Sequence, residues 1–477
     1  MRRPVPPLTF TRDGFWLWAL TMARNSPLSL RRSAALVFPL TLFATPVFAQ
    51  TGVNEDSVVL QPDKVTDDAP VVETVTEANL PSWSEANATE LLSFIEKVGS
   101  EGLFPQDYNP DGLAQAILAK NQIQLDKVAT DSFLLLATHL RVGRTPNAAR
   151  KQWFMTDSDA QATPLIPLLT SALNSNSVSR SLAGLDPVHP NFAVLKAALK
   201  SAKSAADANA IRVNMERWRW MPRDLGDRYV ISNVPEYLTR VVHGGTIIAT
   251  HKAVVGKPTT PTPQLNPMAT GIIVNPTWTL PKSIIAEGIG ATIARSPATA
   301  RTQGYTWTGS GKTLSVVQQP GANNALGVMK MEMLNPHAIY LHDTPSKCAF
   351  ASAARAFSHG CIRTERALHF SGLMAVYFAG KSPEEFGEAI ASGKTTKFSF
   401  EDPFPVYVAY WTVVPNAAVN GIAKLADIYG RDAPVVTSFA KPGRAAAVLI
   451  SPNLPEVVPT APMTTTQVNK PGNGGIY

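Results

Sequence analysis

The distribution of hydrophobic positions divides the chain into two parts. Between about residues 84 and 210, apolar segments open with helix-capping residues, which predicts a set of short helices. After Pro222, β-branched residues recur in alternating runs, which is typical of strands. The predicted helices are Asn87–Val98, Leu113–Ala119, Asp131–Leu140, Pro164–Leu173 and Asn191–Ala202. The predicted strands are Tyr229–Val234, Leu238–Val242, Thr246–Val255, Gly271–Val274 and Pro405–Trp411.

Local signals mark where these elements begin and end. Ser82-Trp83-Ser84-Glu85 has the spacing of a capping box, and Asn109-Pro110 combines a cap with Pro at the first helical position. Pro222 stops any helix that precedes it. His243-Gly244-Gly245 predicts a hairpin turn, because glycine adopts positive φ without strain. One convincing helix is expected in the second part, at about Glu365–Phe378.

The chain is therefore predicted to be α+β, with a small α-helical domain followed by a mainly β domain. The helical domain is expected at 84–212 and the β domain at 213–435. Residues 50–83 are acidic and lack a sustained period, so they are expected to form a disordered linker. Residues 436–477, whose end is rich in Pro, Thr and Gly, are expected to be a largely disordered tail.

The N-terminus has the pattern of a secretory signal peptide. Arginines precede the apolar run Ala34–Phe48, and Ala49 suits a small-residue cleavage site. The run is shorter than the roughly 20 apolar residues that a membrane span needs. We therefore expect residues 1–49 to be a signal peptide and the mature protein to be exported to the periplasm. Met22 is an alternative start, and an uncleaved N-terminal anchor is the alternative interpretation.

The charge distribution weakens a nucleic-acid interpretation. The 477 residues hold 43 Lys and Arg against 36 Asp and Glu, a net charge of +7. The predicted signal peptide accounts for +5 of this, residues 50–84 carry −6, and the remaining body carries +8. Exported proteins seldom meet nucleic acid, so the basic excess loses its main support as a sign of that partner.

The chemistry-bearing residues gather between Ala338 and Arg366. The chain has two cysteines, which excludes a disulfide-stapled scaffold and any four-cysteine metal site. Ala338–Leu341 is predicted to be a buried strand that delivers His342 at its end. Cys361 lies in Ser358–Arg363 (SHGCIR), directly before a helix that Thr364 is expected to cap. A thiol at a helix N-terminus faces the positive end of the dipole, which favours the thiolate.

These residue types make up the parts of a thiol acyl-transferase. Cys361 is the candidate nucleophile and His342 the candidate base, with Ser358 or a backbone carbonyl near Asp343 to orient it. Gly360 allows close backbone approach, so that amides beside Cys361 can form an oxyanion hole. His359 is expected to shape the loop.

Three other interpretations of the same residues stay open. Cys361 can be a buried small hydrophobic residue. It can also form a disulfide with Cys348, which an oxidising compartment permits. A metal site from His342, His359, Cys361 and Asp343 has no supporting ligand spacing.

Several segments of the chain resemble the L,D-transpeptidases with a YkuD domain, in the YcbB-like branch. Ser358–Arg363 is similar to the S-H-G-C-[IVL]-R signature of that family, and Ile339–Pro345 (IYLHDTP) to its second catalytic motif. Pro320–Gly327 (PGANNALG) resembles a P-G-x-x-N-x-L-G segment of the branch, and Leu140–Arg144 (LRVGR) its helical scaffold. The resemblance covers about residues 85–435.

The resemblance implies a fold, a reaction and a set of site residues. The reaction is peptidoglycan 3→3 cross-linking between a tetrapeptide donor and an amine acceptor, without metal or cofactor, by an enzyme that carbapenems acylate. Residues 283–327 would form a capping segment over the site. The implied roles are the nucleophile Cys361, the proton carrier His342, the loop residues Ser358, His359 and Gly360, and the substrate-binding residues Arg363, Asp343 and Asn324.

Alternatives within and outside the family remain. The acyl-enzyme can pass to water, as in an L,D-carboxypeptidase, or to an outer-membrane protein that is tethered to the wall. A non-catalytic wall-binding scaffold is the alternative from another class. The chain departs from larger relatives in one respect: only about Ser181–Arg212 separates the two domains, which is too short for a peptidoglycan-binding domain.

Overall fold

The computed structural model describes residues 81–157 and 164–441. The predicted signal peptide, almost all of the predicted linker and the final Pro-rich stretch lie outside the described residues. Within the described ranges, no helix combines the length and the apolar character that a membrane crossing requires.

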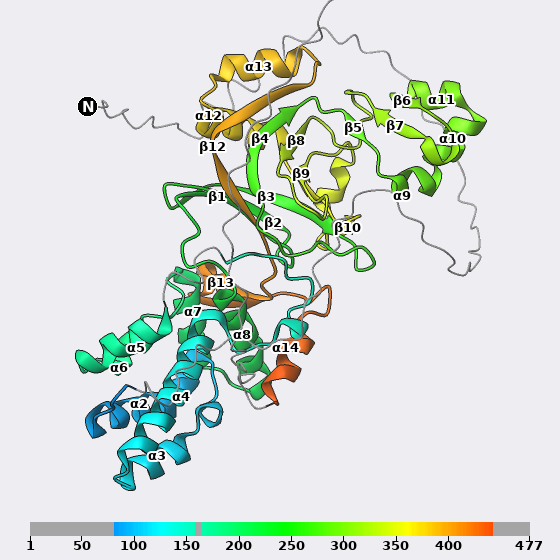
Figure 1. The fold of residues 1–477 in the computed structure, drawn as a ribbon. Coiled ribbons are helices and arrows are strands. Elements are labelled where there is room, and N and C mark those ends of the chain that lie inside the picture. The colour runs from blue at the N-terminus through cyan, green and yellow to red at the C-terminus, as the bar shows by residue number, and fades with distance from the viewer. Residues whose placement is uncertain (1–80, 158–163, 442–477) are drawn as a thin grey trace, which may run out of the picture. The chain divides into compact units, whose positions relative to one another are not determined.

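The first part of the chain is helical, as the sequence predicts (Figure 1). Its helices are α2 (Glu85–Lys97), α3 (Pro110–Leu118), α4 (Gln122–Val142), α5 (Leu165–Asn174), α6 (Val178–Ala183), α7 (Pro190–Lys200) and α8 (Ala205–Arg219). The cap at Asn109 is confirmed, because its side chain accepts a hydrogen bond from the Gly112 amide. The predicted capping box at Ser82 is wrong: Ser84 caps α2 by accepting from the Asn87 amide.

An apolar core holds the first helices together. Trp83, Leu91, Phe133 and Leu140 are at most 1% exposed and belong to one cluster. The Trp83 indole also donates to the Thr130 hydroxyl at 3.0 Å, which satisfies its polar group inside the core. The segment before α2 is thereby tied to α4.

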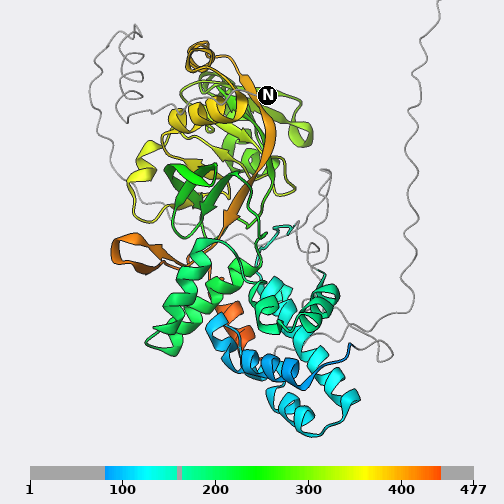
Figure 2. The ribbon, with the colours of Figure 1, turned by 90° about the vertical axis from the view of Figure 1, so that its left-hand side faces the viewer.

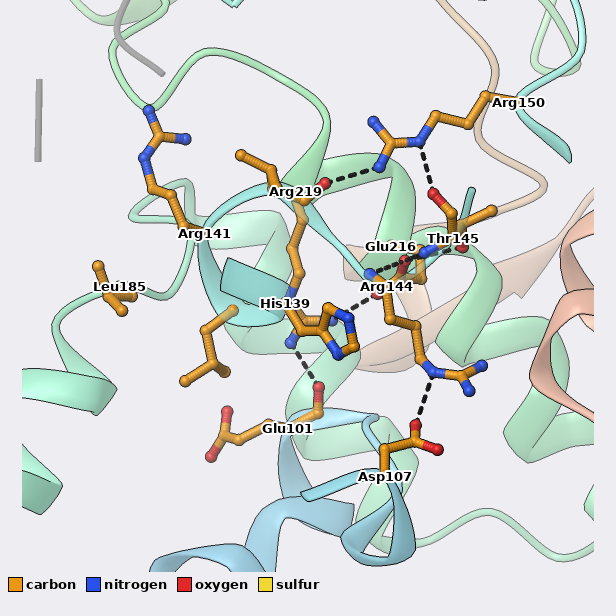
Figure 3. A network of polar contacts seen from close by, with 12 residues as sticks. Glu101, Asp107, His139, Arg141, Arg144, Thr145, Arg150, Leu185, Glu216 and Arg219 are labelled. Atoms are coloured by element: carbon orange, nitrogen blue, oxygen red, sulfur yellow. Dashed lines mark hydrogen bonds and ion pairs between the residues drawn. The ribbon is translucent and has the colours of Figure 1, made fainter. Parts of the chain in front are cut away.

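A network of charged side chains lies buried where α4, α8 and the C-terminal helix α14 (Asp432–Phe439) meet (Figure 3). The Glu216 carboxylate is fully buried and accepts hydrogen bonds from the Arg144 amide and from the amide and hydroxyl of Thr145, at 2.8–2.9 Å. Arg219 donates to its other oxygen at 3.3 Å. Arg144 pairs with Asp107 at 2.8 Å. It also donates to the carbonyl of Ser438 in α14 and to that of Lys441 just after this helix.

The C-terminal helix returns to the helical part of the chain. Figures 1 and 2 show α14, the red helix, beside α8. Arg217 on α8 pairs with Asp432 at the start of α14, with 2.7 Å between Nη1 and Oδ1. Thr412, just after the last long strand, donates to the same carboxylate at 2.9 Å and accepts from Asn214 at 3.0 Å. These contacts join the helices to the β part.

The second part is β-rich, also as predicted. Its strands are β1 (Arg228–Asn233), β2 (Leu238–His243), β3 (Thr246–Gly256), β4 (Met268–Val274), β8 (Met329–Glu332), β9 (Leu341–His342), β10 (Ala356–Ser358), β11 (Ile362–Thr364) and β12 (Thr396–Ala409). They form one sheet in the order β10-β3-β11-β9-β8-β4-β12-β1-β2. Because β2 also pairs with β3, this order closes on itself, and only β10 stands outside the ring.

The predicted hairpin turn between β2 and β3 is confirmed. Gly244 and Gly245 have φ of 57° and 69°, the backbone that two-residue hairpins favour. The predicted single helix of this part corresponds to α12 (Ala367–Ala379), which packs against β12 and β4. The β part also holds α13 (Pro383–Ala391), whose Ser382–Glu385 capping box was not recognised in the sequence.

A small sheet and short helices make up the expected capping segment, 283–327, together with the residues from Trp278 that lead into it. The sheet has the order β5-β7-β6, from β5 (Trp278–Thr279), β6 (Tyr305–Thr308) and β7 (Ser315–Gln318). The helices are α9 (Lys282–Ile284), the π-helix η5 (Ile285–Ile289), α10 (Gly290–Arg295) and α11 (Pro297–Thr302). A separate apolar cluster that includes Leu280, Ile293 and Val316 supports them.

A further hairpin joins β13 (Val413–Asn416) to β14 (Gly421–Lys424).

Two expectations about the site segment are wrong. Ala338–Leu341 is not a strand, because Ala338 has a φ of 51° and regular pairing begins only at Leu341. Thr364 does not cap a helix, since it belongs to β11 and is completely buried. The helix α12 starts three residues later, behind Arg366.

Candidate functional site

Three basic side chains form a row across neighbouring strands. Lys330 on β8 is paired with His342 on β9, and His342 is paired with Arg363 on β11. Paired residues project from the same face of a sheet, and so do residues two apart on one strand. Cys361 lies directly before β11, two residues ahead of Arg363. The next amide along the chain, that of Ile362, donates to the Tyr340 carbonyl at 3.1 Å, so Cys361 stands beside the segment that leads to His342.

The alternate residues on the same strands face the core. Met329, Met331, Leu341 and Ile362 are completely buried. This alternation fixes the register, because a slip by one residue would exchange the apolar and the basic faces. The row of basic residues is thus held in place by the apolar side chains between them.

The loop before β11 holds Cys361 in one orientation. The buried Ser358 hydroxyl donates to the Cys361 carbonyl at 2.6 Å and accepts from the Gly360 amide at 3.1 Å. The Thr262 hydroxyl donates to the Gly360 carbonyl at 2.8 Å. Gly360 itself has a φ of 117°, and a Cβ there would lie 3.1 Å from Ile339 Cδ1. Only glycine meets both requirements without strain.

One ring nitrogen of His342 is engaged in a hydrogen bond that orients the imidazole. It is 6% exposed, and its Nδ1 lies 2.5 Å from the backbone carbonyl of Asp343. A carbonyl only accepts, so Nδ1 carries the proton and Nε2 is left with its lone pair. This is the type of backbone contact that the sequence suggested for orienting the base. Burial, followed by the nearby charge of Arg363, lowers the pKa of His342 to about 3.

The Cys361 thiol is half-buried and contacts polar neighbours. It donates to the Ala338 carbonyl at 3.7 Å, and the Tyr340 side chain is near enough to the sulfur to affect its pKa. Burial raises the pKa of the Cys361 thiol, while Tyr340, Lys330 and Arg363 act in the opposite direction. The expected thiolate at a helix N-terminus is therefore wrong, because strand β11 and two further residues separate the cysteine from α12.

Two predicted substrate-binding residues are occupied by internal contacts. Asp343 is buried, accepts from the Val328 amide at 3.0 Å and pairs with Lys347. Asn324 is also buried; its amide donates to the carbonyls of Pro276, Gln318 and Gln319, and its oxygen accepts from the Leu326 amide. Both side chains hold loops beside the site and leave little capacity for substrate.

The other predicted residues retain free polar atoms. Arg363 is half-buried, and its Nε finds no hydrogen-bond partner among residues 81–157 and 164–441. His359 is 45% exposed, and its Nε2 lies 3.5 Å from Glu287 of η5 in the capping segment. The loop residue His359 thus faces the capping segment.

Cys348 stands apart from the site chemistry. It is exposed on the short helix η7 (Lys347–Ala351), and both Cys348 and Cys361 are free thiols. The disulfide interpretation is therefore wrong for this structure. In the part of the chain that is described, no group of three His, Cys, Asp or Glu side chains gathers as metal ligands would.

Three residues at the site were not singled out from the sequence. Tyr340 belongs to the IYLHDTP motif, which predicts no role for it, and Thr262 and Lys330 lie outside the motifs that predict the site. Tyr340 lies two residues before His342, which is a signal of shared face. Lys330 and Thr262 have no local signal, because only strand pairing and the loop contact bring them to Cys361.

The helical part and the β part of the chain each match the model of a known domain family. Residues 76–199 match the model of a scaffold domain, and residues 227–379 match the YkuD model, the L,D-transpeptidase catalytic domain. A Haemophilus influenzae protein named "Putative L,D-transpeptidase" is 25% identical over 378 residues, which cover 74% of this chain and 76% of that protein.

Solved structures of L,D-transpeptidases show a weaker likeness. The L,D-transpeptidase from Mycobacterium smegmatis matches with 16% identity over 38% of this chain and 58% of that chain, with a TM-score of 0.20. L,D-transpeptidase 1 of Mycobacterium tuberculosis matches with 15% identity over 38% of this chain and 61% of that chain, with a TM-score of 0.17.

The strand row, the SHGCIR loop and the two domain matches agree with one another. The chain therefore carries an L,D-transpeptidase catalytic domain of the YkuD family, preceded by a scaffold domain.

Proposed function

We propose that this protein is a peptidoglycan L,D-transpeptidase that forms 3→3 cross-links through a thioester at Cys361. The observation that supports this most directly is the position of Cys361 directly before β11, whose Arg363 pairs with His342 on one face of the sheet, with Nε2 of His342 left as a proton acceptor. An acyl transfer needs a nucleophile, a proton carrier and donors for the oxyanion, and all three lie within this face and its loop.

The residues have the following roles in this proposal. The Cys361 sulfur attacks the carbonyl of the third stem-peptide residue, and the thiol proton passes to Nε2 of His342. The Gly360 amide already donates to Ser358, so the Cys361 amide and the Tyr340 hydroxyl are the donors left for the oxyanion. As the C–N bond breaks, His342 returns the proton to the amine of the departing D-alanine.

A weakly basic histidine suits the second half of this step. Once protonated, an imidazole with a pKa of about 3 is a strong acid and donates readily to a leaving amine. The acceptor amine then attacks the thioester, His342 takes its proton, and the thiol is restored. No other co-reactant enters this scheme.

The acceptor and the compartment belong to the same proposal. The signal-like N-terminus supports export to the periplasm, where stem peptides are available. A stem-peptide amine gives a cross-link, an outer-membrane protein amine gives a tethered protein, and water gives a free tripeptide. The peptide acceptor is favoured because the second domain match is described as a transpeptidase catalytic domain.

The test is incubation of the purified mature protein with defined disaccharide-tetrapeptide, followed by mass spectrometry. The expected products are 3→3 cross-linked dimers and free D-alanine, with no dimer from a Cys361→Ala variant. Tripeptide alone would indicate a carboxypeptidase and overturn the cross-linking proposal. Absence of any product, together with absence of a carbapenem adduct at Cys361, would indicate a wall-binding scaffold.

A further inference from the structure

Lys330 is a half-buried lysine that forms no ion pair within residues 81–157 and 164–441. Burial lowers the pKa of its ammonium, which nearby Glu332 opposes. Glu332 itself, on the same strand, forms its ion pair with Lys397 at 2.6 Å. A partly buried charge that lacks a counter-charge costs stability. Folding alone therefore does not account for a lysine here.

The ammonium of Lys330 lies on the face of an aromatic ring at the site. Its Nζ is 4.3 Å from the centroid of the Tyr340 ring, a distance typical of a cation–π interaction. The side chain of the same tyrosine acts on the Cys361 thiol and favours its ionised form. Lys330 thus holds a ring that itself influences the nucleophile.

Strand pairing also places Lys330 opposite His342, with Arg363 on the other side of the imidazole. Four charged or titratable groups surround the thiol. They are Lys330 on β8, Tyr340 directly before β9, His342 on β9 and Arg363 on β11. Among these groups, Lys330 and Arg363 are the two that carry a positive charge at neutral pH. Neither is neutralised by an ion pair within the described ranges.

We propose that Lys330 is a positioning residue for the acyl transfer: its ammonium, seated on Tyr340 and in line with His342 and Arg363, supplies the positive field that favours negative charge on Cys361. The catalytic part of this role rests on the proposed function. The effect of Lys330 on the thiol does not, because it is present before any substrate binds. Lys330 opposes the effect of burial, which favours the neutral thiol.

The same field remains useful through the reaction. The negative charge moves from the sulfur to the carbonyl oxygen in the tetrahedral intermediate and stays near the two cations. The field also disfavours the imidazolium form of His342, which promotes return of the proton to the leaving amine. A lysine with its own carboxylate partner would be neutralised and would provide neither effect.

The experiment is the pH dependence of Cys361 alkylation by iodoacetamide, in which the thiolate displaces iodide. It uses the full mature chain with Cys348→Ser, which leaves Cys361 as the one thiol of the sequence. The variants are Lys330→Met and Lys330→Arg. The matched control is Lys252→Met, which removes the same charge from β3, where Lys252 pairs with Glu365. Thermal melts establish that each variant is folded.

Lys330→Met is expected to raise the apparent pKa of alkylation and to slow the reaction at pH 7 by about tenfold. Lys330→Arg should stay within about twofold of the parent, because the charge and the ring contact are both kept. Lys252→Met should leave the profile unchanged. A Lys330→Met profile that overlays the parent, or a Lys330→Arg rate as low as that of Lys330→Met, would overturn the proposal. Alkylation needs no peptidoglycan, so a failed cross-linking assay does not affect this result.

Discussion

Glu216 in the helical part and Cys361 in the loop before β11 both lie near arginine or lysine side chains, but these cations have different partners in the two places. Around Glu216, arginine side chains are engaged with carboxylates and carbonyls: Arg219 reaches both Glu216 and the Glu101 carbonyl, and Arg144 pairs with Asp107 (Figure 3). Around Cys361, neither Lys330 nor Arg363 forms an ion pair within residues 81–157 and 164–441.

The difference separates a structural use of charge from a chemical one. A buried carboxylate that accepts several hydrogen bonds stabilises the particular arrangement of helices that supplies its donors. Cations without a carboxylate are left to act on negative charge that arises elsewhere, here on the Cys361 sulfur or on bound substrate. Changes in the first region should therefore alter stability, and changes in the second should alter reactivity.

The largest effect on reactivity is expected from Cys361→Ser. The cross-linking rate should fall by on the order of 10⁴-fold or more, because the nucleophile is lost. The free energy of unfolding should change by less than about 1 kcal/mol, since the side chain is half-buried and makes one weak donor contact. Product formation by mass spectrometry and urea denaturation measure the two quantities. A large loss of stability would contradict the assignment of this region to chemistry.

The largest effect on stability is expected from Glu216→Ala. Its removal leaves Arg219 and the Arg144 and Thr145 amides without their buried acceptor, which should cost about 3–5 kcal/mol in the free energy of unfolding. Asp131→Ala is the matched control on α4, because Asp131 is in an exposed pair with Lys127. That change should cost less than about 1 kcal/mol. Equal effects in urea denaturation would contradict the structural role of the network.

The pH dependence of stability should involve both regions in the same way. Burial lowers the pKa values of His139 in the helices and His342 on the strands to about 3. The unfolded chain takes up a proton on each below pH 6.5, whereas the folded chain does not, so stability is complete above pH 6.5 and falls as the pH falls. At pH 5 each histidine should contribute a loss of about 2 kcal/mol.

The variants His139→Gln and His342→Gln check this dependence. Each should lose less stability than the parent between pH 7 and pH 5, as followed by urea denaturation at a series of pH values. Only His342→Gln should also abolish cross-linking at pH 7. If both variants kept the slope of the parent, the burial of neutral imidazoles would be refuted in both regions.

A smaller effect is expected from Gly360→Ala. The added methyl group meets Ile339 Cδ1 at 3.1 Å on a backbone with φ of 117°, which should cost about 1–3 kcal/mol of stability. Displacement of the loop should also slow cross-linking by at least about tenfold, because acyl transfer depends on the position of the nucleophile. Gly99→Ala is the control, since nothing lies within 4 Å of a Cβ there. Unchanged kinetics in Gly360→Ala would show that the loop tolerates a different backbone.

Much of the fold could be predicted from local signals. The cap at Asn109, the stop at Pro222 and the turn at Gly244-Gly245 each act within a few residues, and each is present as predicted. The first turns of α4 and the helices α6 and α8 were not predicted, although Asn121 caps α4 and Ser204 caps α8. The sequence of α8 is polar, and α6 is short and lacks a side-chain cap. The closure of the sheet through β2 and β3 depends on pairing between distant segments, which no local pattern contains.

The site was only partly accessible from the sequence for the same reason. Cys361 and His342 stand in recognisable motifs, and the pairing of Arg363 with His342 brings the two motifs together. Asn324 and Asp343 also stand in such segments, yet their side chains are used inside the loops. Thr364 has the composition of a cap, but its burial in β11 overrides that preference. Lys330 comes to the site only through its pairing with His342.

The most direct test of the central claim is the detection of the acyl-enzyme itself. The purified mature protein is mixed with disaccharide-tetrapeptide, quenched with acid and analysed by intact mass and peptide mapping. The account predicts an adduct with the mass of the substrate less D-alanine, attached to Cys361 and absent from Cys361→Ser. Cross-linked product without an adduct at Cys361, or an adduct that maps to Cys348, would contradict it.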